Sequence, residues 1–309
     1  MKKNFLIVGG SGLLGSHWLK KKLNRYLFFA TINKKLINNN KIKKIFLDLK
    51  NKKKIFLFLK DKNIDVVINL AGSTDVDKCE KSKNKTFFAN VTIPKNLAYA
   101  CKIKSIPLVH ISTDHIFNDK KKIRYSEIHS PNPINFYAKT KYFAENYIKK
   151  TLKKYIIIRT NFFSLLDVKS TFLRKIFILS KKKNPPIIKL WSNVYFTPVH
   201  ASTIVDIVYL LLEKKLYGIF NISSNEVLSK FDFYSLVKKT FRLDKLIFLS
   251  TIFNTHKKKN HTVKRPLNMS LNNKKIKNIF PYLNSRLNIK KQILMLKKDL
   301  KSNITLSKC

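Results

Sequence analysis

The chain has 309 residues, which suits one large domain or two closely joined ones that bury a substantial core around a cleft. Its formal net charge is +47, but only seven of the 64 basic residues are arginine, and the lysines are scattered in short runs with no dense basic arm. A solvated basic surface that attracts anionic substrates therefore explains the charge better than selected binding to nucleic acid does.

The N-terminal segment predicts a strand, a tight turn and a helix. An apolar run at 5–8 ends in a glycine, and three glycines with the spacing G-x-x-G-x-x-G lead into a helical pattern at 16–23. Four of the six glycines in the chain lie in this turn, which favours a dinucleotide-binding loop over an ordinary turn. Glycine lets the backbone approach a pyrophosphate, and the helix N-terminus attracts the phosphates. The loop residues expected at the cofactor are Gly9, Gly12, Leu13, Leu14 and Gly15.

The choice of cofactor is expected at the end of the second predicted strand, 26–32. An acidic residue at this position would hold the ribose hydroxyls of NAD, whereas neutral or basic residues accept the additional phosphate of NADP. The residues present are Asn33, Lys34 and Lys35. We therefore expect NADPH as the cofactor, with NADH as the alternative because lysine is common throughout this chain.

Two further segments are expected to contact the cofactor. Asp48 and Leu49 follow a predicted third strand and precede an amphipathic helix that runs to about residue 62. Asp48 can accept a hydrogen bond from the adenine amino group, and the alternative is a helix N-cap. A nearly continuous apolar strand at 64–70 closes in Ala71 and Gly72, whose small size lets the chain pass close to the cofactor.

The order of elements up to residue 111 predicts the fold class. A polar segment at 73–80 is followed by a helix at about 87–102, which Pro94 kinks or restarts, and by a fifth strand at 106–111. Strands that alternate with helices predict an α/β fold with a Rossmann-type, doubly wound parallel sheet. Ligands bind at the carboxyl ends of the strands in such a sheet.

A catalytic set is predicted after the fifth strand. Thr113 follows that strand, and Tyr137 and Lys141 share one face of a helix expected at 135–150. A neighbouring ammonium is expected to lower the pKa of the Tyr137 phenol, and the Thr113 hydroxyl can bind the substrate oxygen. The spacing alone is common by chance, but its place after the fifth strand of a glycine-loop fold favours proton donation.

At this point the chain resembles the extended short-chain dehydrogenase/reductase superfamily and, within it, the dTDP-4-dehydrorhamnose reductase family. The matching pieces keep their order over nearly the whole length. They are the glycine loop Gly9–Gly15, the segments Asp65–Gly72, Val76–Glu80 and Ser112–Phe117, Tyr137–Lys141 with Glu145, Arg159-Thr160, and Arg265–Leu271.

The resemblance implies that Thr113, Tyr137 and Lys141 form a catalytic triad. Tyr137 would protonate the C4 carbonyl oxygen of a nucleotide-linked keto sugar as hydride arrives, Lys141 would bind the nicotinamide ribose, and Thr113 would orient the carbonyl. The substrate-binding set is Ser112, His115, Phe162 and Arg265. His115 stands where the family usually has tyrosine and Phe162 where it usually has tryptophan, so the identity of the sugar is left open. Arg265 can bind the substrate diphosphate or be a surface arginine.

We expect an NADP(H)-binding domain at 1–160 and a smaller, mainly substrate-binding part at 161–309 with segments that return to the first domain. The later part should contain a helix at 204–212, a strand at 218–223 and a helix at 231–241. The helix at 204–212 is too short to span a bilayer. The polar Ser16 and His17 oppose a secretory signal, and three cysteines, odd in number and without metal-type spacing, indicate a reducing cytoplasm.

The leading hypothesis is the NADPH-dependent reduction of a nucleotide-diphosphate 4-keto-6-deoxy sugar for surface polysaccharide synthesis. The alternatives are an epimerase or dehydratase of the same superfamily, which would consume no net NADPH, and a non-catalytic NADP(H)-binding regulatory subunit. The sequence assigns no metal site; some members of the family use Mg²⁺, which no residue pattern here demands. No nucleic-acid or membrane partner is expected, and a homodimer is left open.

Overall fold

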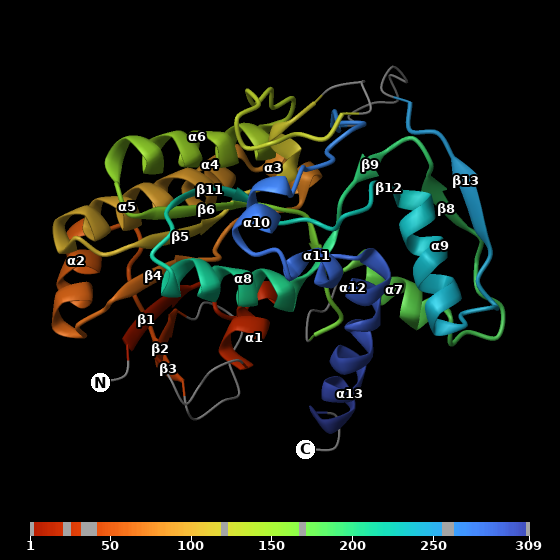
Figure 1. The fold of residues 1–309 in the computed structure, drawn as a ribbon, viewed down its shortest axis with the longest axis horizontal. Helices are drawn as coiled ribbons and strands as arrows, with labels where there is room; N and C mark the ends of the chain where they lie inside the picture. Colours follow the sequence, from red (N-terminus) through yellow and green to blue (C-terminus); the bar gives the residue numbers. More distant parts are fainter. Residues whose placement is uncertain are drawn as a thin grey trace.

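The computed structural model describes residues 3–20, 26–31, 42–118, 123–166, 171–254 and 263–306 (Figure 1). Asn33, Lys34 and Lys35, the expected determinants of cofactor choice, lie outside these ranges. In the part of the chain that is described, no helix combines the length and apolar character needed to cross a bilayer.

A seven-stranded parallel sheet forms the centre of the molecule, which confirms the predicted doubly wound architecture. The strands lie in the order β11-β6-β5-β4-β1-β2-β3. The order reverses between β1 and β4, so loops that follow these two strands diverge and leave a crevice at the carboxyl edge. The strand bounds are β1 Lys3–Val8, β2 Tyr26–Thr31, β3 Lys43–Ile45, β4 Val66–Asn69, β5 Leu108–Ile111, β6 Tyr155–Arg159 and β11 Gly218–Asn221.

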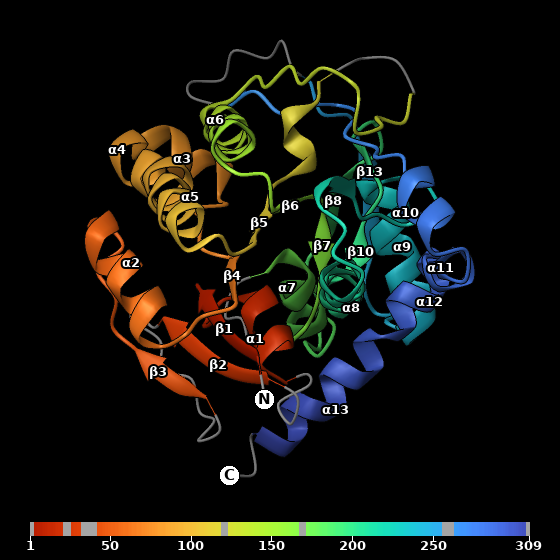
Figure 2. The ribbon, with the colours of Figure 1, turned by 60° about the vertical axis from the view of Figure 1, so that its left-hand side comes forward.

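Both faces of the sheet are buried because its strands are apolar at successive positions. Phe5 and Ile7 pack into one hydrophobic core, and Leu6 and Val8 pack into the other. Figure 2 shows helices on both sides of the sheet. One side is covered by α2 (Lys52–Asp61), α5 (Ile93–Lys104) and α6 (Phe136–Thr151), and the other by α1 (Leu13–Lys20), α8 (Ala201–Glu213), α10 (Lys274–Ile279) and α11 (Leu283–Arg286).

The segment between β4 and β5 differs from the expected single helix. The polar stretch at 73–80 contains α3 (Val76–Lys81), which begins at the side-chain cap of Asp75. The chain continues through α4 (Lys83–Phe87) and one π-helical turn, η1 (Phe88–Thr92), before α5 starts with Pro94 in its first turn. The predicted interruption near Pro94 is therefore present, and a proline in the first turn of a helix removes no helical hydrogen bond.

The later part of the chain adds β11 to the main sheet beside β6 and places smaller elements next to the carboxyl edge. Three two-stranded sheets form there, and a separate apolar cluster joins Phe196 of one of these sheets to Phe233 and Ile293 of neighbouring helices. The paired strands are β7 (Phe162–Phe163) with β10 (Val199–His200), β9 (Tyr195–Phe196) with β12 (Leu228–Ser229), and β8 (Ile188–Trp191) with β13 (Phe248–Thr251). The helices of this part are α7 (Phe172–Leu179), α9 (Lys230–Phe241), α12 (Ile289–Leu294) and α13 (Leu296–Leu306).

Candidate active site

The glycine loop connects β1 to α1 at the carboxyl edge of the sheet. Gly9 has φ +83°, and a Cβ at this residue would lie 2.7 Å from the backbone nitrogen of Ala71. A Cβ at Gly15 would lie 2.3 Å from the carbonyl oxygen of Gly10, so α1 can start only where this residue has no side chain. Both glycines are therefore required by the close packing of the loop itself.

Gly12 has a different environment. A Cβ there would meet only the carbonyl oxygen of Gly9, at 3.4 Å, so the space in front of the loop is open. The next residue, Leu13, begins α1, and Leu14 is buried in the core below. The loop and the first turn of α1 thus form a cradle into which a side chain at Gly12 would project, which fits a dinucleotide pyrophosphate.

The other expected cofactor residues lie on neighbouring strand ends. Ala71 and Gly72 follow β4, and a Cβ at Gly72 would lie 3.1 Å from Oδ1 of Asn90 and 4.0 Å from Nζ of Lys141. Asp48 accepts a hydrogen bond from the backbone of Lys50 and is not the N-cap of α2, because that role belongs to Asn51. The N-cap alternative for Asp48 is therefore wrong.

Tyr137 and Lys141 lie one turn apart near the start of α6, as the sequence predicts. Asn135 caps this helix by accepting from the backbone nitrogen of Ala138 at 2.9 Å, and the Glu80 carboxylate of α3 accepts from the backbone nitrogen of Phe136 at 3.1 Å. A carboxylate at a helix N-terminus is favourable. These two contacts fix the end of α6 that carries the pair, and they were not predicted.

The expected lowering of the Tyr137 pKa is wrong. Tyr137 is 7 % exposed, and burial raises the pKa of its phenol; a hydrogen bond with Thr113 opposes this effect, and the charge of Asp114 adds to it. Burial penalises the phenolate more than the neighbouring polar groups stabilise it. Tyr137 is therefore a neutral phenol, and it carries the proton that a general acid donates.

Lys141 is 5 % exposed, and burial lowers its pKa to about 8 while the nearby Glu145 carboxylate raises it. Its Nζ lies 2.5 Å from the carbonyl oxygen of Ile111 and 3.3 Å from Nε2 of His110. Glu145 itself is paired with Arg159 of β6, whose Nη2 lies 2.8 Å from Oε2. The sequence analysis did not identify His110. A histidine within the otherwise apolar strand β5 was the feature of the sequence that could have indicated it.

The loop after β5 supplies the third expected catalytic residue. Thr113 is buried, and its hydroxyl lies 3.2 Å from a carboxylate oxygen of Asp114 and caps the short helix η2 (Asp114–Ile116). Asp114 also accepts from Nδ2 of Asn161 at 2.9 Å, and burial raises its pKa to about 6. Thr113 is thus held between Asp114 and the phenol of Tyr137.

Two expected substrate residues carry buried polar atoms without a hydrogen-bond partner among the described residues, Oγ of Ser112 and Nδ1 of His115. The His115 ring lies 5.6 Å from the Tyr137 ring. Burial, followed by the positive charges of Lys230 and Arg265, lowers the pKa of His115 to about 3, so its imidazole is neutral. Buried polar atoms normally have partners, and a polar ligand beside Tyr137 would supply one for His115.

For the remaining two expected substrate residues, Arg265 and Phe162, the contacts described are with other parts of the protein. Arg265 donates to the Asp77 carboxylate of α3 at 2.6 Å, so it is tied to the protein and is not a free surface arginine. Phe162 lies in β7, pairs with Val199 and packs against the main core. Lys230, which the sequence analysis missed, starts α9 with its Nζ 3.3 Å from the centre of the Phe196 ring.

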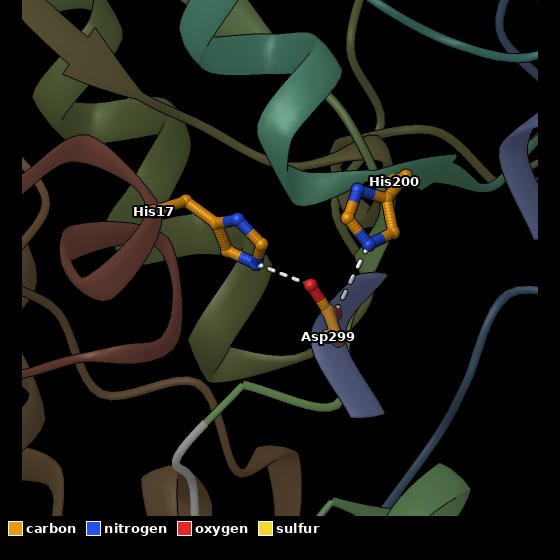
Figure 3. Close-up of side chains that lie close together, drawn as sticks. All are labelled: His17, His200 and Asp299. Atoms are coloured by element: carbon orange, nitrogen blue, oxygen red, sulfur yellow. Dashed lines mark hydrogen bonds and ion pairs between the residues drawn. The ribbon is translucent and has the colours of Figure 1, made fainter. Parts of the chain in front are cut away.

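A buried cluster distant in sequence brings together three potential metal ligands, although the sequence shows no metal-ligand pattern. Figure 3 shows His17 of α1, His200 before α8 and Asp299 of α13 turned toward one another, and their ligand atoms lie within 4.8 Å. Oδ2 of Asp299 accepts from His200 Nε2 (3.1 Å), Ser164 Oγ (2.5 Å) and the Leu165 backbone (2.8 Å). Because these groups satisfy one another, we interpret the cluster as a hydrogen-bonded anchor for α13.

Comparisons with known proteins agree with this geometry. The family model described as "RmlD substrate binding domain" matches residues 2–294. The chain is similar to the "Probable low-salt glycan biosynthesis reductase Agl14" of Haloferax volcanii (28 % identity over 55 % of this chain and 58 % of the relative). It is also similar to the "Spore coat polysaccharide biosynthesis protein SpsK" of Bacillus subtilis (28 % identity over 60 % and 65 %). The matches therefore span less than two thirds of the length of these relatives.

Among solved structures, dTDP-4-dehydrorhamnose reductase from Bacillus anthracis, in complex with NADP, superposes with a TM-score of 0.81 at 23 % identity. The superposition covers 98 % of this chain and all of that one. At this identity the likeness concerns the fold.

Proposed function

We propose that this chain, which belongs to the RmlD substrate binding domain family, uses NADPH to reduce the C4 carbonyl of a nucleotide-diphosphate 4-keto-6-deoxy sugar. The family predicted from the sequence motifs is confirmed. The observation that carries the proposal is the position of Tyr137, a neutral phenol whose ring lies 5.6 Å from that of His115, a buried residue with an unpartnered ring nitrogen among the described residues.

In this reaction the carbonyl carbon gains a hydride and the carbonyl oxygen gains a proton. NADPH, when bound, supplies the hydride. Tyr137 donates its phenolic proton to the oxygen, and the hydroxyl of Thr113, already in contact with Tyr137, orients that oxygen. A positioned proton donor of this kind accelerates a reaction by roughly 10²–10⁴-fold.

Lys141 would hold the nicotinamide ribose and return a proton toward Tyr137 after each turnover. Its low exposure and its contact with the carbonyl of Ile111 keep the side chain in one place. The glycine loop, with Gly12 facing open space, would hold the pyrophosphate. Asp48, Leu49, Ala71 and Gly72 remain the proposed contacts to the rest of the cofactor.

The substrate would lie on the side of Tyr137 that carries His115. Ser112 and the neutral imidazole of His115 are suited to hydrogen bonds with sugar hydroxyls, because Oγ of Ser112 and Nδ1 of His115 have no hydrogen-bond partner among the described residues. Arg265 would bind the diphosphate, and the positive charge of Lys230 adds to the attraction of an anionic substrate. We place the reaction in the cytoplasm, in keeping with the free thiols of Cys79 and Cys101, and in the synthesis of surface polysaccharide.

The test is a mixture of purified protein, NADPH and dTDP-4-dehydrorhamnose in which cofactor absorbance is followed. We expect oxidation of NADPH by the native chain, and loss of at least roughly 10²-fold in kcat in Tyr137→Phe with NADPH binding retained. Tyr147→Phe, on the same helix but away from the site, is the matched control. Full activity in Tyr137→Phe would refute the mechanism. NADPH binding without oxidation would favour an epimerase or a regulatory subunit.

A further inference from the structure

The side chain of Lys141 has a second buried contact behind the proposed reaction site. Its Nζ lies 3.3 Å from Nε2 of His110, a β5 residue that is completely buried. The other ring nitrogen, Nδ1, lies 3.1 Å from Nδ2 of Asn69 at the end of β4. The three side chains therefore form a line from the centre of the sheet to α6.

The orientation of the Asn69 amide follows from the backbone. The N–H of Ala71 donates to Oδ1 of Asn69 at 3.2 Å, so the amide nitrogen Nδ2 is the atom that faces His110. An amide nitrogen only donates, and Nδ1 of His110 must therefore accept. In a neutral imidazole the single proton is then on Nε2, the atom that faces Lys141.

His110 is also uncharged. Burial, followed by the positive charge of Lys141, lowers its pKa well below the ordinary value. An ammonium group has only donors, so the charged form of Lys141 faces another donor across this contact. The uncharged amine has one lone pair, which can accept the proton of Nε2 while the amine still donates to the carbonyl of Ile111.

We propose that His110 is a positioning residue that holds Lys141 from behind and, by donating from Nε2, stabilises its uncharged amine. Lys141 then releases a proton more readily to restore the Tyr137 phenol after each reduction. An N–H bond of the Lys141 ammonium breaks and the O–H bond of Tyr137 forms as the proton moves to the phenolate oxygen. The uncharged amine of Lys141 then takes a proton from solvent. The part that concerns Tyr137 rests on the proposed reductase activity.

Other titratable groups near Lys141 do not replace this contact. Those on α6 and on the elements packed against it include Tyr137, Glu145, Arg159, Cys79 and Asp114. Glu80 of α3 accepts from the backbone at the start of α6, and the His115 ring of η2 faces Tyr137. Glu145 favours the charged form of Lys141 but is itself paired with Arg159. Lys83 of α4 and Lys95 of α5 lie over aromatic rings of α6. Among the described residues, His110 is thus the titratable side chain in direct contact with Nζ of Lys141.

The first experiment observes His110 without any turnover. In protein labelled with ¹⁵N-histidine, the ring signals that disappear in His110→Gln belong to this residue. We expect the Nε2-protonated neutral tautomer. The ¹⁵N chemical shifts of the ring should change with pH near 8 as Lys141 titrates, and this pH dependence should be absent in Lys141→Met. A Nδ1-protonated ring, or a ring insensitive to Lys141, would overturn the inference.

The second experiment follows the pH dependence of kcat with NADPH and the keto sugar. His110→Leu removes the Nε2–H donor that favours the uncharged amine of Lys141. The limb of the kcat–pH profile that reports Lys141 should therefore move up by about one pH unit. His110→Gln, which can still present an N–H, should keep the limb near its native place, and His129→Gln, on the surface, is the control. An unmoved limb in a folded His110→Leu would refute the inference. No turnover by the native chain would refute the reductase proposal alone, and the ring signals would still decide on His110.

Discussion

Arg265 donates to Asp77 across 2.6 Å, so the residue proposed to bind a substrate diphosphate is held by an acidic side chain of α3. The Asp77 side chain is 54 % exposed and that of Arg265 is 24 % exposed, so both are accessible from solvent. A diphosphate would have to compete with the carboxylate for the same guanidinium.

This competition predicts opposite effects of two substitutions. Arg265→Ala should raise KM by about tenfold or more with kcat little changed, because a bidentate charged contact is lost. Asp77→Asn should lower KM a few-fold, because the guanidinium is freed. Steady-state kinetics at low salt measures both. If Asp77→Asn instead raises KM as Arg265→Ala does, Asp77 serves to position the arginine.

Two glycines of the loop should differ in their roles: Gly12 in binding the cofactor and Gly15 in the stability of the fold. Gly12→Ala places a methyl group in open space, so the free energy of unfolding should change by less than about 1 kcal/mol while affinity for NADPH falls at least tenfold. Gly15→Ala forces a contact with the carbonyl of Gly10 and should destabilise the fold by roughly 1–3 kcal/mol. Urea unfolding and fluorescence titration with NADPH distinguish the two. Unimpaired NADPH binding by Gly12→Ala would show that the cofactor does not lie on this loop.

The raised pKa of Asp114 should make the free energy of unfolding depend on pH. Burial raises its pKa from 3.8 to about 6, so the folded chain binds this proton more tightly than the unfolded chain. The stabilising effect is complete below pH 3.8 and is lost as pH rises through about 6. Relative to Asp114→Asn, the native chain should lose about 2–3 kcal/mol of unfolding free energy between pH 4 and 7. Parallel pH profiles of the two proteins would contradict this.

The cluster of His17, His200 and Asp299 should contribute to the free energy of unfolding by anchoring α13. Asp299→Asn removes a carboxylate that accepts from His200, Ser164 and Leu165, and we expect a loss of roughly 1–3 kcal/mol in the free energy of unfolding. Burial opposes ionisation of Asp299, but hydrogen bonds from His200 and Ser164 lower its pKa overall. The native chain should therefore be more stable than Asp299→Asn above pH 3.8, and this difference in unfolding free energy should decrease below that pH. Asp61→Asn, at an exposed site, should change stability by less than about 1 kcal/mol. Equal effects of the two substitutions would show that the cluster does not anchor α13.

Some predictions failed for identifiable reasons. The expected lowering of the Tyr137 pKa considered only the neighbouring lysine, whereas burial of the phenol outweighs the other effects. The segment at 73–80 has few apolar residues, and its sequence predicts only a polar segment. In the structure it contains α3, and Val76 and Cys79 of that helix pack in one cluster with Tyr137. Both errors concern burial, which depends on elements that are distant along the chain.

The sequence by itself determined the parallel sheet, the glycine loop, the family and the adjacency of Tyr137 and Lys141, because each depends on a local pattern: apolar runs, glycine spacing or residues four apart on one helix. Only the tertiary structure decided that His110 lies behind Lys141, that Asp77 holds Arg265, and that His17, His200 and Asp299 meet. Residues separated by 31 to 282 positions are brought together by strand order and helix packing, and no periodicity in the sequence encodes those distances.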